Sequence, residues 1–294
     1  KSGSSFAVHQ EGGAFSASLS GSVSNELSGG YNRGGAITPD GQRFAIGGSG
    51  GILKIFNTSD GSLSKTLSGH SSYVNGLAFS PDGQKLASVS SDKTLKIWDV
   101  NGGYVLNTFT GFTSDEIAVA YSPDGRYVAA GGFDKLVKVY DAQGGYLVRT
   151  LSGFTDDIWS LQFSPDGGSL LSGDGNGNII VWNTSSWTES RRVFQKGWIT
   201  SIRFKSDGQE VVTTSEGTSV NVWSFPGMGS LHTMNHTSKA WMAAISPDDK
   251  YVVSSGADNV LRVWDLNTGT SIQVLDGHTA TVGVVLFSSD GQKI

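Results

Sequence analysis

The chain has 294 residues, of which 37% are hydrophobic and 10% aromatic, so it can bury a core of globular size. The formal net charge is −5 and Lys and Arg form no cluster, which argues against nucleic acid as a partner. There is no cysteine, and this excludes disulfides, thiolate metal sites and cysteine catalysis. The longest apolar runs, such as Val282 to Phe287, are too short to span a bilayer, so we expect no membrane insertion. Composition leaves the compartment open, with the cytoplasm slightly favoured and secretion as the alternative.

A turn of the type Ser/Thr-Pro-Asp-Gly recurs along the chain. Its prolines are Pro39, Pro81, Pro123, Pro165 and Pro247, with the first four spaced by 42 residues and the last by 82. Degenerate copies at 205–208 and 288–291 bring the total to seven turns. Proline sets φ at the second turn position and glycine accepts a positive φ later in the turn, so the pattern indicates tight turns at a fixed period.

A second series of aromatic residues follows the same period. Its members each end a short β-rich segment and are Phe56, Trp98, Tyr140, Trp182, Trp223 and Trp264. Between two turns the alternation of apolar and polar residues predicts four strands, in the second repeat over 73–79, 85–89, 94–98 and 104–109. Four short strands in about 40 residues are typical of a propeller blade, and the chain is predicted to be all-β.

The segments Gly69-His70, Leu77 to Gly83 and Ile97-Trp98-Asp99 closely resemble the WD-repeat family. The resemblance covers the whole chain and implies a seven-bladed β-propeller of four-stranded antiparallel blades, in one domain over 1–294. The blades are expected at about 31–69, 70–111, 112–153, 154–194, 195–235 and 236–277, with the last formed by 278–294 and 1–30. In that last blade 281–287 would be the first strand, and 6–9, 14–18 and 23–27 would supply the others. The chain lacks an initiator Met and stops where another strand should begin, so we expect a piece of a larger protein.

The resemblance also implies a structural hydrogen-bond network in two blades. Its expected members are His70, Ser88, Asp92 and Trp98 in one blade, and His236, Ser254, Asp258 and Trp264 in another. Buried polar groups have to be hydrogen-bonded, which favours a structural role for these histidines over a catalytic one. We therefore expect no catalytic residue, no metal and no cofactor.

Residues that differ between repeats are better candidates for function than those that all repeats share. Trp159 and Trp241 occupy an inner-strand position held by smaller residues elsewhere, and the same resemblance places this position near the central channel on the upper face. The other candidates for that face are Trp198, Tyr73, Phe133, Asp115, Glu116, Asp156 and Asp157. Large aromatic and acidic groups on a rigid rim favour a basic peptide or protein as partner. The competing interpretation is that Trp159 and Trp241 only fill the channel.

These features predict a non-catalytic scaffold that binds proteins or peptides, as part of a larger protein or complex. Two alternatives use the same residues or composition: a carbohydrate-binding propeller, and a structural subunit of an extracellular assembly.

Overall fold

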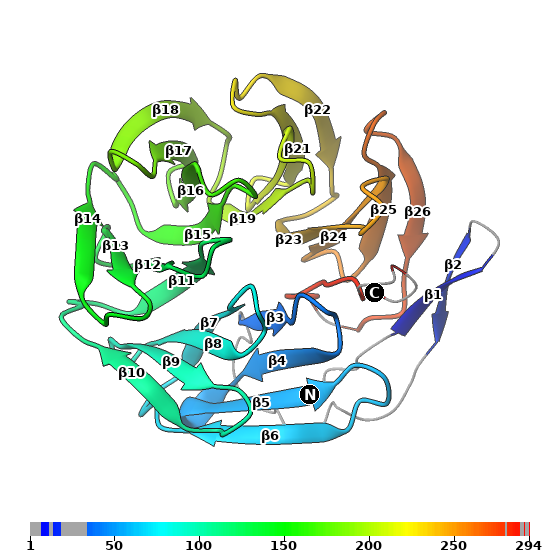
Figure 1. Ribbon diagram of the computed structural model, residues 1–294. Coiled ribbons are helices and arrows are strands. Elements are labelled where there is room, and N and C mark those ends of the chain that lie inside the picture. Colours follow the sequence, from blue (N-terminus) through cyan, green and yellow to red (C-terminus); the bar gives the residue numbers. More distant parts are fainter. Residues whose placement is uncertain (1–6, 12–13, 19–33, 280, 289–290, 292–293) are drawn as a thin grey trace.

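The computed structural model describes residues 7–11, 14–18, 34–279, 281–288, 291 and 294. Within them, six four-stranded antiparallel sheets are arranged as blades around a central axis (Figure 1). In each blade the strands pair in chain order, and the first strand is innermost. From blade one to blade six, each first strand contacts the first strand of the blade that follows. Each blade therefore follows the expected repeat.

The strand bounds follow the turns of the sequence. Blades one and two consist of β3 (Gly35–Ile37), β4 (Arg43–Gly47), β5 (Ile52–Asn57), β6 (Leu63–Ser68), β7 (Val74–Phe79), β8 (Lys85–Ser90), β9 (Leu95–Asp99) and β10 (Val105–Phe109). Blades three and four consist of β11 (Glu116–Tyr121), β12 (Tyr127–Gly132), β13 (Val137–Asp141), β14 (Leu147–Leu151), β15 (Ile158–Phe163), β16 (Ser169–Asp174), β17 (Asn178–Asn183) and β18 (Thr188–Phe194). Blades five and six consist of β19 (Ile199–Phe204), β20 (Glu210–Ser215), β21 (Ser219–Ser224), β22 (Ser230–Asn235), β23 (Ala240–Ile245), β24 (Tyr251–Gly256), β25 (Leu261–Asp265) and β26 (Ser271–Leu275). A short 3₁₀ turn, η1 (Ser49–Gly51), precedes β5.

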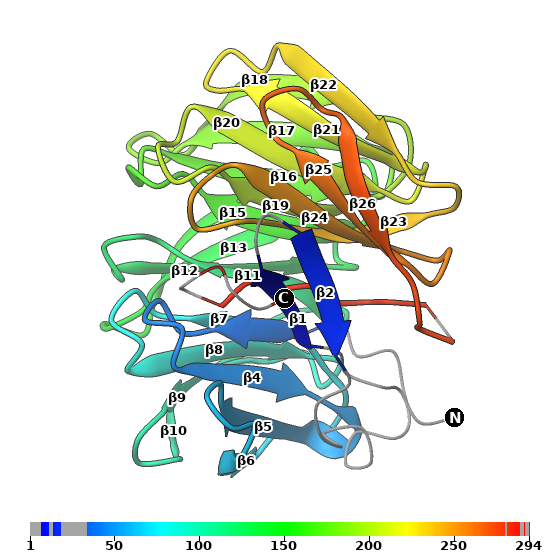
Figure 2. The same cartoon turned by 90° about the vertical axis from the view of Figure 1, so that its right-hand side faces the viewer.

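The prediction of seven blades is wrong, because the segments expected to form the seventh blade do not make a common sheet. β1 (Ala7–Glu11) and β2 (Ala14–Ser18) pair with each other in a separate two-stranded sheet, drawn in blue in Figure 2. Residues 281–288 lie between blades six and one but have no strand assignment; the expected strand over 23–27 lies outside the described residues. Val282 N donates to Gly256 O at 3.4 Å. Val284 lies so close to Gly35 that a Cβ added to Gly35 would be 2.9 Å from Val284 Cγ1. The segment thus takes the place of an inner strand, and the described residues form no four-stranded sheet behind it.

The core lies between neighbouring blades. In one cluster, Val139 and Leu151 of blade three pack with Leu161 and Phe163 of blade four, all of them buried. The fully buried Trp98 lies near the end of β9, the third strand of blade two, and belongs to a similar cluster with residues of blade one. Each blade therefore depends on its neighbour to bury its apolar face. No helix in the described part is long and apolar enough to cross a membrane.

A β-bulge recurs near the start of the first strand in blades two to six. There the pairing with the second strand skips one residue, which is Asn75, Ile117, Trp159, Thr200 or Trp241. A bulge leaves one residue out of the ladder and redirects its side chain. Two of the tryptophans singled out from the sequence therefore stand at the bulged position.

Candidate partner-binding surface

The loop before each inner strand meets the turn between the second and third strands of the same blade. Ser91 N donates to Tyr73 O at 2.9 Å in blade two, and Phe133 N donates to Asp115 O at 3.0 Å in blade three. The same bond recurs in blades four to six. We call the face formed by these loops and turns the upper face, and the opposite face, which carries the proline turns, the lower face.

Three aromatic side chains from three successive blades contact one another at the upper face. The rings of Trp159 and Trp198 stack with centroids 4.8 Å apart and planes inclined by 15°. Phe133 meets Trp159 edge to face at 5.7 Å and 64°. Phe133 and Trp198 remain 38% and 36% exposed, while Trp159 between them is half-buried. We call Phe133, Trp159 and Trp198 the aromatic ladder; it offers a rigid π surface that reaches from blade three to blade five.

Trp241 and Tyr73, the other two aromatic candidates, have no ring contact with the aromatic ladder. Trp241 is half-buried at the bulge of β23, and its indole N–H is buried without a hydrogen-bond partner. Tyr73 is 51% exposed on blade two. The structure therefore brings together three of the five aromatic residues chosen from the sequence.

Two of the predicted acids lie at the edge of the aromatic ladder. A Cβ on Gly175 would lie 2.9 Å from Asp156 Oδ2 and 3.2 Å from Trp159 Nε1, so this glycine lets the carboxylate and the indole approach. Burial and the neighbouring Asp156 raise the pKa of Asp157. Lys135 Nζ lies 3.8 Å from Asp156 Oδ1, a partly exposed pair of the kind that contributes little stability. Gly175 and Lys135 were not predicted from the sequence, because their contacts with Asp156 and Trp159 form only when the chain is folded.

Glu116, by contrast, lies in the interior rather than on the acidic surface expected for it. It is fully buried at the start of β11, and neither carboxylate oxygen has a hydrogen-bond partner. Burial, helped by the nearby Asp134, raises its pKa to about 8. The ammonium of Lys138 opposes this shift but is itself held by Asp134 at 2.8 Å. Asp115 stays half-buried at the upper face.

The two histidine networks have the expected members within hydrogen-bond distance. His70 Nδ1 lies 2.8 Å from Asp92 Oδ2 and His70 Nε2 lies 2.7 Å from Ser88 Oγ, while Trp98 Nε1 donates to the same hydroxyl at 2.7 Å. Because Ser88 accepts from Trp98, its own proton is available to a neutral His70. Burial lowers the pKa of His70 despite the opposing carboxylate of Asp92, in agreement with the neutral form.

The second network repeats this arrangement in blade six. His236 Nε2 lies 2.7 Å from Ser254 Oγ, and Trp264 Nε1 donates to that hydroxyl at 2.7 Å. His236 Nδ1 lies 3.2 Å from Asp258, which also accepts from Arg262 at 2.8 Å. Burial again lowers the pKa of the histidine.

Blade five contains a third version of the network that sequence analysis missed. Gln195 stands where the other two blades have His, and its amide oxygen accepts from Thr213 Oγ1. Thr213 in turn accepts from Trp223 Nε1 at 2.8 Å, as Ser88 does from Trp98. The available signal was the position of Gln195 relative to Ser206, which matches that of His70 relative to Pro81. An uncharged amide at the histidine position favours a structural role for all three networks.

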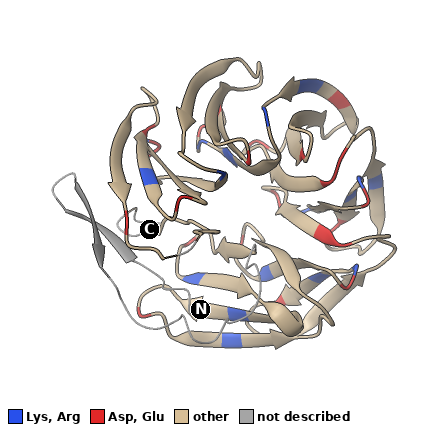
Figure 3. Cartoon of the chain, turned by 180° about the vertical axis from the view of Figure 1, so that it is seen from behind, with Lys and Arg blue, Asp and Glu red and all other residues tan. Residues whose placement is uncertain are grey.

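In the view of Figure 3, the Lys, Arg, Asp and Glu residues of the described chain are scattered over the blades. Within the same residues no group of three or more His, Cys, Asp or Glu side chains is close enough to hold a metal ion.

The repeated blades and the Trp-centred networks define a WD-repeat β-propeller. The family described as "WD domain, G-beta repeat" matches residues 61–99, 103–141, 145–183, 189–224 and 228–265. These matches cover more than half of the chain, which therefore belongs to the WD-repeat family.

Among curated proteins, the chain is similar to eukaryotic translation initiation factor 3 subunit I. The proteins of that name from Xenopus tropicalis and Homo sapiens are each 33% identical to it over 103 residues. The match spans 32% of this chain and 32% of each relative, which is about a third of either length.

Proposed function

We propose that the chain is a non-catalytic interaction module that binds a protein or peptide partner on its upper face. The observation that carries this proposal is the aromatic ladder, in which rings from three blades stack and two of them remain more than a third exposed. Rigid aromatic side chains bury a large area on binding and lose little conformational entropy, so they are frequent centres of interfaces. The module acts by presenting this surface, with no reaction at the site.

The acids beside the aromatic ladder favour a basic segment in the partner. The Asp156 carboxylate lies next to the Trp159 indole at Gly175, and burial together with the charge of Asp156 raises the pKa of the adjacent Asp157. A Lys or Arg of the partner would supply that charge and could pack its cation against an exposed ring.

The curated relatives support a place in a multisubunit assembly. Their printed name makes each of them a subunit of a translation initiation factor. We propose that this chain likewise works as one component of a larger complex.

Affinity capture from the native source tests the proposal. The wild type is compared with a Trp159→Ala/Trp198→Ala variant and with a Tyr104→Ala control, all three checked for folding. Tyr104 is a suitable control because it is 56% exposed in the loop between the third and fourth strands of blade two, at the lower face. We expect a partner that the wild type and the control retain and the double variant loses. A partner retained equally by all three proteins would place the binding surface elsewhere.

A further inference from the structure

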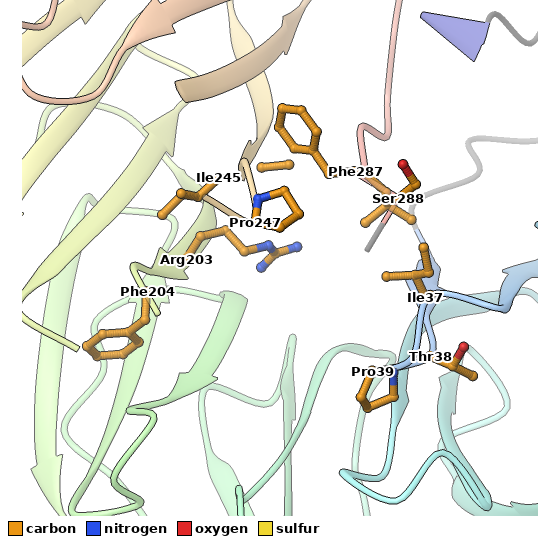
Figure 4. Close-up of a pocket in the computed structure, with 12 residues that line it drawn as sticks. Ile37, Thr38, Pro39, Arg203, Phe204, Ile245, Pro247, Phe287 and Ser288 are labelled. Atoms are coloured by element: carbon orange, nitrogen blue, oxygen red, sulfur yellow. The ribbon is translucent and has the colours of Figure 1, made fainter. Parts of the chain in front are cut away.

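A pocket of about 290 Å³ opens at the lower end of the central channel (Figure 4). Four parts of the chain line it: the end of β3 with its turn, β19, β23 with its turn, and the segment before residue 289. The walls are mainly apolar and include Ile37, Pro39, Ile245, Pro247 and Phe287. The pocket is near the small end of the range of ligand sites, enough for one amino-acid residue or a small acid.

Among the described residues of this lining, Arg203 is the one with a charged side chain. It stands on the inner strand of blade five, where the strands of blades one, two, three and six have alanine in the same register. The residues at this level are Ala36, Ala78, Ala120, Gln162, Arg203, Ala244 and Leu286. Four blades thus have only a methyl side chain at this level, and blade five places a guanidinium there.

The guanidinium of Arg203 has few partners within the protein. Nη1 donates to Ile202 O at 2.8 Å, and no described carboxylate lies within ion-pair distance. Burial lowers its pKa to about 10, so it stays protonated at neutral pH. Because a guanidinium carries five N–H donors, most of them are left for a ligand. Figure 4 shows the side chain projecting into the pocket.

We propose that Arg203 binds a carboxylate that bears an apolar substituent, either a small monocarboxylic acid or the C-terminal residue of a peptide. A carboxylate matches the planar fork of arginine with two parallel hydrogen bonds. Its single charge balances the single cation, whereas a phosphate dianion would leave one charge uncompensated among apolar walls. The apolar lining accommodates the substituent. This site lies at the opposite end of the channel from the aromatic ladder. The proposal for Arg203 is therefore independent of the partner binding proposed for the aromatic ladder.

The first test measures binding of N-acetyl-leucine and of N-acetyl-leucinamide to the purified chain by calorimetry. The two probes share the apolar side chain and differ in the carboxylate. We expect the acid to bind and the amide to bind at least about tenfold more weakly, since the amide lacks the charge that pairs with arginine. Equal binding of the two probes, or binding of neither, overturns the proposal.

The variant Arg203→Gln tests whether Arg203 is the residue that binds the carboxylate. Glutamine is the natural residue at this level in blade four, Gln162, so the substitution suits the fold. We expect it to weaken binding of the acid at least about tenfold, while the exposed Arg149→Gln of β14 and the Trp159→Ala/Trp198→Ala variant bind as the wild type does. Retention of the acid by Arg203→Gln would overturn the assignment.

Two short peptides distinguish the sources of the carboxylate. One ends in leucine with a free carboxylate, and the other has the same sequence with a C-terminal amide. Tighter binding of the free-acid peptide than of N-acetyl-leucine would identify a peptide C-terminus as the ligand. Weaker binding would identify a small acid.

Discussion

Trp159 and Trp198 stack in parallel although they belong to different blades, one at the bulge of β15 and the other just before β19. At the bulge Trp159 is not paired with the neighbouring strand, and its indole is directed away from the sheet. The loop before β19 places the indole of Trp198 against the indole of Trp159. The pair therefore joins blades four and five at the upper face and also forms the centre of the proposed binding surface.

This contact predicts a measurable coupling in stability. A double-mutant cycle of Trp159→Ala and Trp198→Ala should give an interaction free energy of about 0.5–1.5 kcal/mol, because stacked aromatic pairs contribute this much beyond buried area. Urea unfolding of the wild type, both single variants and the double variant measures it. The cycle of Trp198→Ala with Tyr104→Ala on the lower face is the control, with a coupling close to zero. Similar couplings in both cycles would show that the stacking contributes nothing specific.

Glu116 should make the protein less stable as the pH rises. Its folded pKa of about 8 is above the ordinary value of 4.5, so the folded state holds a proton that the unfolded state has lost. The free energy of unfolding therefore falls from pH 4.5 through pH 8, by a few kcal/mol as an order of magnitude. In Glu116→Gln this contribution is absent, and the difference in stability between variant and wild type should grow in favour of the variant over the same pH window. Urea unfolding at four pH values measures it, and parallel curves for the two proteins would exclude a raised pKa.

The repeats predicted the strands because the turns recur at a fixed period, and the resemblance to the WD-repeat family implied the two histidine networks. The number of blades could not be predicted in this way. Each turn indicates that an inner strand precedes it, but it does not indicate that three further strands complete a sheet. The turn at Ser288 and Gly291 exists, with Gly291 N donating to Ser288 O at 2.9 Å, but no four-stranded sheet lies behind it in the described residues. Sequence also placed Glu116 beside Asp115 as a second surface acid. The structure leaves Asp115 half-buried at the upper face and buries Glu116 at the start of β11, and this difference depends on how blade three packs against its neighbours.

Replacement of His70 by glutamine should be tolerated better than replacement by alanine. Gln195 already provides an acceptor for Thr213 in the equivalent network of blade five, so a glutamine at position 70 can accept from Ser88 in the same way. Alanine leaves buried polar groups without partners and should lower the free energy of unfolding by about 2–3 kcal/mol, against about 1 kcal/mol for glutamine.

The same histidine predicts how stability responds to acid. Its folded pKa is lowered by burial, so its contribution is complete above the ordinary value of 6.5 and is lost as the pH falls below it. His70→Gln cannot take up this proton, and the wild type should therefore lose more stability than His70→Gln between pH 7 and pH 5. Denaturant unfolding at the two pH values measures the difference; equal losses would mean that the histidine keeps an ordinary pKa.

Gly175 controls how closely Asp156 and Trp159 approach, and Gly175→Ala should disturb both. The added Cβ would lie 2.9 Å from a carboxylate oxygen of Asp156 and 3.2 Å from the indole nitrogen of Trp159, so one or both side chains have to move. We expect a changed near-ultraviolet circular dichroism signal from the stacked indoles, a loss of about 1 kcal/mol in stability and a several-fold weaker affinity for the partner of the upper face. Gly227→Ala is the matched control, because its Cβ would meet only Ser224 Oγ, at 3.8 Å. An unchanged dichroism signal in Gly175→Ala, together with wild-type stability, would show that the carboxylate and the indole adapt without cost, and that the edge of the aromatic ladder is not held in place by this glycine.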